Sequence, residues 1–333
     1  MERVEVRAVD PTLEWQRSGQ GCLYWLLTKL GAKVDPGPPT HLNALGEVKA
    51  REVEFRPDGL TDYVTLDLEG VRIWHRGANV DDTVWQWQCR RPQDSSWSNL
   101  AQRTRHRIYT VLSTPKSPWT QTPSNAPNLP WTEVLDYACR WAEFAETADA
   151  VACRIADKVY NLGPQIMEYD CPGGGATHYA MGNFDCSEFL ELLRGGVGFG
   201  RYVNCTDCAT IVSTFANVLG CDLWQSRMGY SFGLNPILAL GSNIWQPACN
   251  WSGFYYHEVA WKGACTENDG VFDACLKVDG DEDPTAPPHT PVLPCNMKFG
   301  NTGDGLYRDR LASPTGSPSC NPRPETRKRR DIS

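Results

Sequence analysis

The stretch "RYVNCTDCATIVSTFANVLGCDLW", residues 201–224, places a cysteine where it could act as a nucleophile. Asn204 is a preferred N-cap residue and Asp207 suits a first helical turn, so a helix is expected to begin at or next to Cys205. Unpaired backbone N–H groups at that end of a helix favour the thiolate over the thiol. The stripe of a buried helix follows, formed by Ala209, Ile211, Val212, Phe215, Ala216, Val218 and Leu219.

Two other interpretations of this cysteine stay open. Cys205 and Cys208 could both be buried core thiols, and Cys208 lies one turn further in, where the backbone amides are already bonded. The C-x-x-C spacing could also form half of a zinc site, but the sequence offers no second pair of similar spacing. We therefore predict no metal and no cofactor.

A thiolate nucleophile needs a base that exchanges its proton and a third group that orients the base. His257 lies in the predicted strand "FYYHEVAW", after the nucleophile helix. His178, in a glycine-rich loop, remains a second candidate. The other histidines lie in proline-rich loops or in the N-terminal region: His41, His75, His106 and His289.

The orienting group is expected on the next strand, "GVFDACLKVD". If Trp261 faces Val271 across the turn, Asp273 lies diagonal to His257 on the same face of the sheet. Asp279 is six residues too late for this register. The chemistry expected of Cys205, His257 and Asp273 is nucleophilic attack on a carbonyl group.

At this point the residues resemble the transglutaminase-like superfamily of papain-fold cysteine enzymes. The run 205–209, Cys-Thr-Asp-Cys-Ala, matches the C-x-D-x-A pattern of many members, and Leu219-Gly220 follows at the expected distance. His257 and Asp273 match the later His and Asp of the family. Val259 stands where the family often has tryptophan. The resemblance covers about residues 131–279.

The resemblance implies an α+β fold with a papain-like, transglutaminase-like core, in which helices pack on an antiparallel sheet. It also implies acyl transfer on amide groups of a peptide or protein substrate through a thioester, as in a transglutaminase, a deamidase or a peptidase. Cys205 would attack the amide, His257 would move protons, and Asp273 would fix the imidazole tautomer. Aromatic residues near His257 are predicted to bind substrate: Trp245, Trp251, Tyr256 and Trp261.

Three alternatives remain. The motif in "FDCSEFLELL" resembles that of the NlpC/P60 cell-wall peptidases and would make Cys186 the nucleophile. A non-catalytic binding module could keep the same fold. A toxin or effector that acts on host proteins is also compatible with the cysteine-rich composition and the basic end of the chain.

An acidic run, "VDGDEDP", matches the start of a calcium-binding loop at Asp279, Asp281 and Asp283. Pro284 follows where an EF-hand loop needs glycine, and its twelfth position is Thr290 rather than glutamate. We interpret this run as a solvated acidic loop.

Element patterns divide the 333 residues into four parts. Residues 1–118 alternate β-formers and are predicted to form a β-rich, sandwich-like domain. Residues 119–130 are a proline-rich linker. Residues 131–312 form the predicted catalytic domain, and 313–333 a disordered basic tail.

The composition is that of a soluble globular protein, with 41% hydrophobic and 22% charged residues. The net charge of −8 argues against nucleic-acid and membrane-surface partners. The beginning of the sequence resembles a strand rather than a signal peptide, so most of the 14 cysteines are expected to be free thiols in the cytoplasm. Small core thiols are expected at Cys139, Cys153 and Cys221. Leaderless export is the alternative, and no oligomeric state is predicted.

Overall fold

The computed structural model describes residues 2–13, 33–34, 47–55, 65–69, 72–73, 77–119, 129–246, 248–314 and 319–333. The chain divides into two compact units, Met1–Val111 and Leu112–Ser333. This boundary precedes the predicted one at residue 118. Trp119, which was assigned to the linker, is fully buried in the second unit, where its indole N–H donates to Thr214 O at 2.8 Å.

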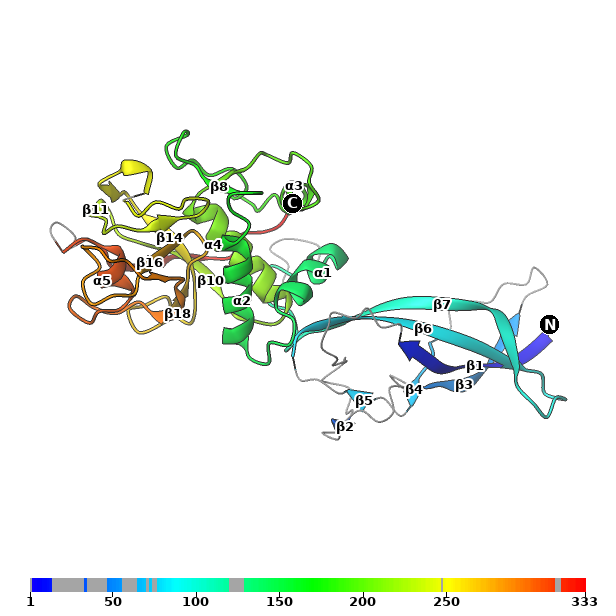
Figure 1. Ribbon diagram of the computed structural model, residues 1–333. Coiled ribbons are helices and arrows are strands. Elements are labelled where there is room, and N and C mark those ends of the chain that lie inside the picture. The colour runs from blue at the N-terminus through cyan, green and yellow to red at the C-terminus, as the bar shows by residue number, and fades with distance from the viewer. Residues whose placement is uncertain are drawn as a thin grey trace. The chain divides into compact units, whose positions relative to one another are not determined.

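The described elements of the first unit are all strands, as the alternating sequence predicts (Figure 1). One antiparallel sheet has the order β4-β3-β1-β6-β7. Its strands are β1 (Glu2–Leu13), β3 (Glu47–Phe55), β4 (Leu68–Glu69), β6 (Asn79–Arg90) and β7 (Ser98–Thr110). The short strands β2 (Lys33–Val34) and β5 (Arg72–Ile73) pair in parallel. A sandwich of two sheets stays a prediction.

The second unit combines helices with mostly antiparallel sheets, so its class is α+β, as expected. Its described helices are α1 (Thr132–Trp141), α2 (Ala148–Tyr160), α3 (Cys186–Leu193), α4 (Cys205–Val218), α5 (Tyr307–Leu311) and the short 3₁₀ turn η1 (Ala248–Asn250). Every residue of α4 is buried, and the helix contacts α1, α2 and strand β14 (Figure 1). This central position agrees with the apolar stripe that follows Cys205 in the sequence.

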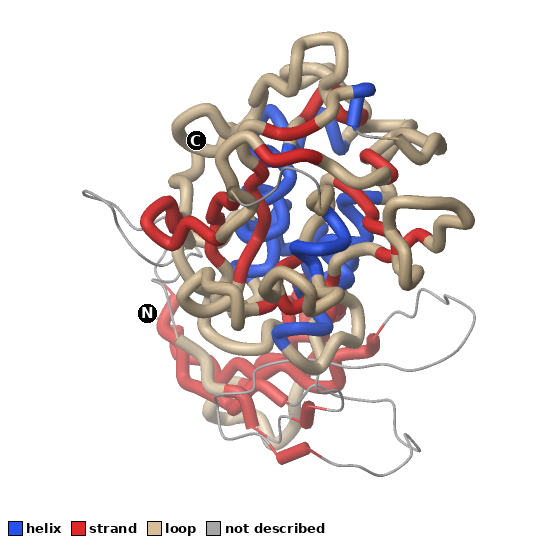
Figure 2. The backbone as a smooth tube through the Cα atoms, turned by 90° about the vertical axis from the view of Figure 1, so that its left-hand side faces the viewer, coloured by secondary structure: helices blue, strands red, loops and turns tan. Residues whose placement is uncertain are grey.

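A five-stranded antiparallel sheet, in the order β18-β15-β14-β10-β19, packs against α4. Its strands are β10 (Trp224–Met228), β14 (His257–Trp261), β15 (Gly270–Phe272), β18 (Cys295–Lys298) and β19 (Pro322–Lys328). Figure 2 shows the helices of this unit gathered inside it, with strands and loops around them. The core therefore lies between α4 and β14, whose five residues are all buried.

Short strand pairs shape the loops around this core. They are β8 (Glu168–Tyr169) with β9 (Tyr202–Val203), β11 (Phe232–Gly233) with β13 (Gly253–Phe254), and β12 (Leu238–Ala239) with β16 (Leu276–Asp279) and β17 (Pro291–Val292). The first pair is parallel, and its strand β9 ends at Val203, directly before the N-cap Asn204 of α4.

The predicted disordered tail is wrong for residues 319–333. Residues 322–328 form β19, which pairs with β10, and Arg330 is only 4% exposed. The charged run was misinterpreted because its side chains stack on aromatic rings. The guanidinium carbons of Arg327 and Arg329 lie 3.7 and 3.8 Å from the ring centroid of Trp224.

Two disulfide bonds also differ from the expected free thiols. Cys153, predicted to be a core thiol, is bonded to Cys295 and ties α2 to β18. Cys171 is bonded to Cys249. Disulfides are typical of oxidising compartments, so these bonds do not support the predicted cytoplasmic location. No helix in the described ranges has both the length and the apolar character that crossing a membrane requires.

Candidate active site

Cys205 is the first residue of α4, as the sequence predicts. The helix is capped reciprocally, because the Asn204 side chain accepts from the backbone N–H of Asp207 at 3.1 Å, and Asp207 Oδ2 accepts from the N–H of Asn204 at 3.1 Å. Cys205 is 5% exposed. Its sulfur therefore lies at the positive end of a helix dipole in a nearly dry environment.

Asp207 does more than cap the helix, since its carboxylate also holds the loop that precedes α3. It is fully buried and accepts from the backbone N–H groups of His178 at 3.0 Å, Tyr179 at 2.8 Å and Ala180 at 2.9 Å. Burial raises the pKa of Asp207, and these N–H groups offset only part of that effect. The aspartate of the C-x-D motif is thus an anchor for the chain beside Cys205.

The same loop is closed on itself by Asp170. This carboxylate accepts from the N–H of Gly173 at 2.8 Å and of Ala176 at 2.9 Å, and it lies 3.2 Å from His178 Nε2. Asn204 Nδ2 donates to Gly175 O at 2.8 Å. His178, the second candidate base, is therefore paired within the loop that it helps to close.

His257 and Asp273 meet in the core. His257 Nε2 donates to Asp273 Oδ2 at 2.8 Å, and the two residues are 0% and 1% exposed. The predicted register is confirmed, because Trp261 faces Val271 between β14 and β15. A turn of this geometry brings the residue after β15 to the first residue of β14.

Two further groups fix the Asp273 carboxylate. Tyr307 Oη donates to Asp273 Oδ2 at 2.8 Å, and the N–H of Cys275 donates to Oδ1 at 2.8 Å. Tyr307 comes from α5, and the sequence analysis missed it. No local pattern points to it, because it lies 34 residues after Asp273.

The side chain of Cys205 is one of the groups that act on the imidazole. Burial lowers the pKa of His257, but the charge and hydrogen bond of Asp273, with a further contribution from the Cys205 side chain, raise it to about 10. His257 Nδ1 is buried and has no hydrogen-bond partner in the described part of the chain. Phe254 fixes the ring plane, stacking at 5.2 Å between centroids.

The predicted substrate-binding aromatics separate into two groups. Trp251 lies against Gly175, where a Cβ atom would come within 3.1 Å of the indole, and Tyr256 Oη lies 3.3 Å from Thr206 Oγ1. Both therefore border the start of α4.

The other two lie elsewhere. Trp245 stacks on His289, with 4.8 Å between ring centroids. Trp261 is fully buried and stacks on Phe299 at 5.1 Å, so its contact with a substrate stays a prediction. Alternation along the strand placed Trp261 on the face of His257, but that face lies inside the core.

The rival nucleophile Cys186 opens α3 in a different environment. Its thiol is fully buried, and burial raises its pKa, with Glu133 adding to the effect. Its N–H donates to Phe184 O at 2.8 Å and to Ser333 O at 3.0 Å. Among the described residues, the one charged group that acts on this thiol is Glu133, and it raises the pKa rather than favouring the thiolate.

Cys208 is a core thiol, buried against Cys275. A hydrogen bond to Cys275 favours its charged form, but burial and the nearby carboxylates outweigh that bond and raise the pKa of Cys208. Cys139 and Cys221 are also buried, as expected of core residues. Within the described ranges, no three His, Cys, Asp or Glu side chains are grouped so that they could hold a metal ion.

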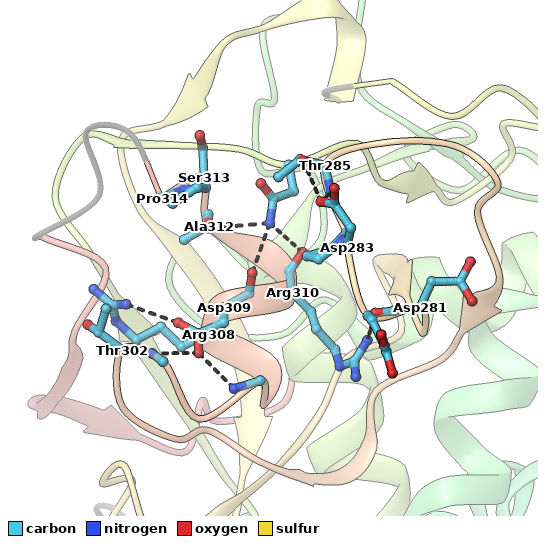
Figure 3. A pocket seen from close by; sticks show the side chains of 15 residues that line it. Asp281, Asp283, Thr285, Thr302, Arg308, Asp309, Arg310, Ala312, Ser313 and Pro314 are labelled. Atoms are coloured by element: carbon cyan, nitrogen blue, oxygen red, sulfur yellow. Dashed lines mark hydrogen bonds and ion pairs between the residues drawn. The ribbon is translucent and has the colours of Figure 1, made fainter.

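An open pocket of ≈ 620 Å³ lies at α5 and the acidic run (Figure 3). Asp281, Asp283 and Asp309 line it together with Arg308 and Arg310. The predicted catalytic residues do not line it. Charged side chains line this open pocket, whereas Cys205 and His257 are buried, so the two are separate features of the unit.

Comparisons with known proteins add little to this geometry. No protein-family model matches the chain, and no curated protein matches it. Among solved structures, the crystal structure of red sea bream transglutaminase is similar, with 12% sequence identity and a TM-score of 0.34. The similarity covers 88% of this chain and 48% of that one, so the chain spans about half of its length. We therefore base the function on side-chain geometry alone.

Proposed function

We propose that this chain is a cysteine acyltransferase or hydrolase that acts on amide groups of peptides or proteins through a thioester on Cys205, within a papain-like, transglutaminase-like core. One observation carries the proposal. A buried imidazole is held by a carboxylate at 2.8 Å, its other nitrogen has no hydrogen-bond partner among the described residues, and the side chain of Cys205 at a helix N-terminus contributes to raising its pKa. Each group supplies what a thiol nucleophile requires: activation, a proton carrier and an orienting acid.

In the first half of the reaction, the Cys205 sulfur bonds to the amide carbonyl carbon. The His257 imidazolium gives its proton to the leaving nitrogen, the C–N bond breaks, and ammonia or an amine departs. In the second half, an acceptor amine or water attacks the thioester, His257 takes the acceptor's proton, and the C–S bond breaks. Asp273 keeps the imidazole oriented throughout.

The developing oxyanion needs donors near Cys205. The first intrahelical bond of this turn runs from the N–H of Cys208 to Asn204 O at 3.0 Å. The N–H groups of Cys205 and Thr206 precede it and have no acceptor within the helix. These two amides are the donors that we assign to the oxyanion.

Access favours a long, flexible acyl donor. Cys205 is 5% exposed and His257 is 0% exposed. The loop 170–180 and the segment 249–256 border the start of α4, so part of this cover must move before a substrate enters. The carboxamide of a glutamine side chain, carried on two methylene groups, reaches such a sulfur more easily than a main-chain amide of a folded protein.

The test is mass spectrometry of a glutamine-containing peptide pool incubated with a primary amine. Incorporation of the amine indicates a transferase, conversion of amide to acid a deamidase, and chain cleavage a peptidase. Cys205→Ala is expected to abolish the change, and the matched control Cys186→Ala to retain it. An unchanged pool with the wild-type protein would contradict the proposal and favour a binding module.

Limiting iodoacetamide tests the assignment of the nucleophile separately. Cys205 is expected to be alkylated first among the free cysteines. Preferential labelling of Cys186 would identify this residue of α3 as the nucleophile and favour the NlpC/P60 alternative.

A further inference from the structure

A buried carboxylate connects the two halves of the candidate site. Glu258 directly follows His257 and is 1% exposed. Its Oε2 accepts from Thr206 Oγ1 at 3.2 Å and from Arg227 Nε at 3.0 Å. Because Thr206 directly follows Cys205, one side chain joins the neighbour of the nucleophile to the neighbour of the base.

The charge of Glu258 is balanced by Arg330, which lies two residues after the end of β19. Arg330 Nη1 donates to Glu258 Oε1 at 2.6 Å, to Thr210 Oγ1 at 2.9 Å and to Gln225 Oε1 at 3.0 Å. Its guanidinium therefore contacts β14, α4 and β10 at once. The Thr210 hydroxyl in turn donates to Thr206 O at 2.7 Å, one helical turn back.

Stability alone does not explain this arrangement. Burial disfavours the Glu258 carboxylate, and Arg330 and then Arg227 outweigh burial and lower its pKa. Replacing a buried ion pair by well-packed apolar residues is often neutral or stabilising, whereas removing one partner leaves an uncompensated charge. The charged pair instead adds geometric specificity, since each of its hydrogen bonds fixes a distance between two elements of the site.

We propose that Glu258 and Arg330 are positioning residues, through which the segment after β19 holds Cys205 of α4 and His257 of β14 at their working separation. This inference rests on the proposed function. It gives a role to the basic residues that the sequence pattern assigned to a disordered tail. Neither residue contacts the reacting atoms; both act through Thr206 and the backbone of β14.

The inference is tested by the rate at which iodoacetamide alkylates Cys205, with thermal unfolding measured on the same samples. Arg330→Met is expected to lower the melting temperature and to slow alkylation by roughly 10- to 100-fold, since small displacements of reacting groups have effects of this size. Arg323→Met is the matched control, because Arg323 lies on β19 over the ring of Tyr230 and its side chain donates to Glu325.

The decisive variant is the double substitution Arg330→Met with Glu258→Leu, which removes both charges and keeps the volume filled. Melting is expected to recover while alkylation stays slow, because the bond to Thr206 is gone. Recovery of both would show a merely structural pair and overturn the inference. Should Arg330→Met fail to fold, the double variant still decides the question.

Arg330→Lys adds a graded rescue. A lysine ammonium can reach Glu258 but cannot serve Thr210 and Gln225 with the same planar geometry, so alkylation is expected to recover only in part. Full recovery would reduce the role of Arg330 to charge balance and overturn its positioning role.

Alkylation needs no substrate, so the inference and the proposed function fail separately. A wild-type protein that alkylates quickly but transfers no acyl group contradicts only the function. Acyl transfer and alkylation that are both unaffected by Arg330→Met contradict only the positioning role.

Discussion

Two of the three His–Asp pairs in the described part of the second unit differ in what surrounds them; the third, His178–Asp170, closes the loop before α3. His257 and Asp273 are 2.8 Å apart between β14 and the end of β15. His289 Nδ1 and Asp279 Oδ2 are 2.6 Å apart at the acidic run. Both carboxylates are buried, so distance and burial alone do not distinguish the pairs.

The neighbouring groups do distinguish them. Asp279 also accepts from the N–H groups of Thr290 at 2.8 Å and Asp281 at 3.1 Å, while the ring of His289 stacks on Trp245. That pair closes a loop. The ring of His257 instead keeps one nitrogen without a hydrogen-bond partner among the described residues, and the side chain of Cys205 at the start of α4 is among the groups that raise its pKa. A His–Asp pair is thus a structural device, and a third group decides whether it can do chemistry.

The largest difference in the rate of acyl transfer is expected from replacing each of the two histidines separately. His257→Gln should lower the rate of acyl transfer by roughly 10⁴-fold or more, because losing the proton carrier disables the whole set. His289→Gln should leave the rate near that of the wild type, since it removes a loop contact only. Rates measured with the peptide pool and a primary amine check this. Equal losses in the two variants would contradict the distinction.

The two carboxylates should differ in the same direction, though less strongly. Asp273→Asn is expected to reduce the turnover number by roughly 10³- to 10⁴-fold, because the amide favours the wrong imidazole tautomer. Asp279→Asn should spare turnover and lower the melting temperature. Steady-state kinetics and thermal unfolding of both variants provide the comparison, and an active Asp273→Asn would remove Asp273 from the mechanism.

Stability should depend on pH at opposite ends of the scale for the two pairs. The pKa of His257 is raised to about 10, so its contribution is complete below its unfolded value of about 6.5 and is lost as the pH rises through 10. The free energy of unfolding should fall over this alkaline range by on the order of a few kcal/mol. Urea unfolding of the wild type and His257→Gln at several pH values tests this, and equal slopes would contradict it.

Asp279 should act at the acidic end. Burial opposes its charge, but His289 and the N–H groups of Thr290 and Asp281 lower its pKa. Its contribution is present above the unfolded value of about 3.9 and is lost as the pH falls through the folded value. In the same urea series, Asp279→Asn should therefore weaken the dependence of the free energy of unfolding on pH at acidic pH, while leaving its dependence at alkaline pH unchanged. A changed dependence at alkaline pH would couple the two pairs.

The smallest expected effect belongs to Tyr307→Phe. Losing this donor removes one of the hydrogen bonds to Asp273 and should cost about 1 kcal/mol of stability, with a modest decrease in turnover. Calorimetry and kinetics on the single variant measure both. A turnover loss as large as that of Asp273→Asn would instead place the Tyr307 hydroxyl in the mechanism.

Local chemistry explains what the sequence could predict. The helix start at Cys205 follows from an N-cap asparagine and an N3 aspartate, which act within one turn. The His257–Asp273 contact follows from two strands joined by a short turn, whose register a few residues determine. Both depend on neighbours in sequence, so pattern and spacing are sufficient.

Long-range partners explain what it could not. Tyr307 lies 34 residues from its partner Asp273, and Arg330 lies 72 residues from Glu258. The two cysteines of the Cys171–Cys249 bond are 78 residues apart. The basic run around Arg330 appears disordered in a composition-based view because the ring and carboxylate that accept it belong to distant strands. Such contacts exist only once the chain has folded.

The Cys171–Cys249 bond limits how the site can open. It fastens the loop 170–180, anchored by Asp207, to the segment 249–256, which ends at Tyr256 beside Thr206. Two independently swinging flaps are thereby ruled out while the crosslink is intact. On the proposed function, any opening that admits a substrate must therefore displace both segments together, and a reductant that breaks the disulfide would allow each to move separately.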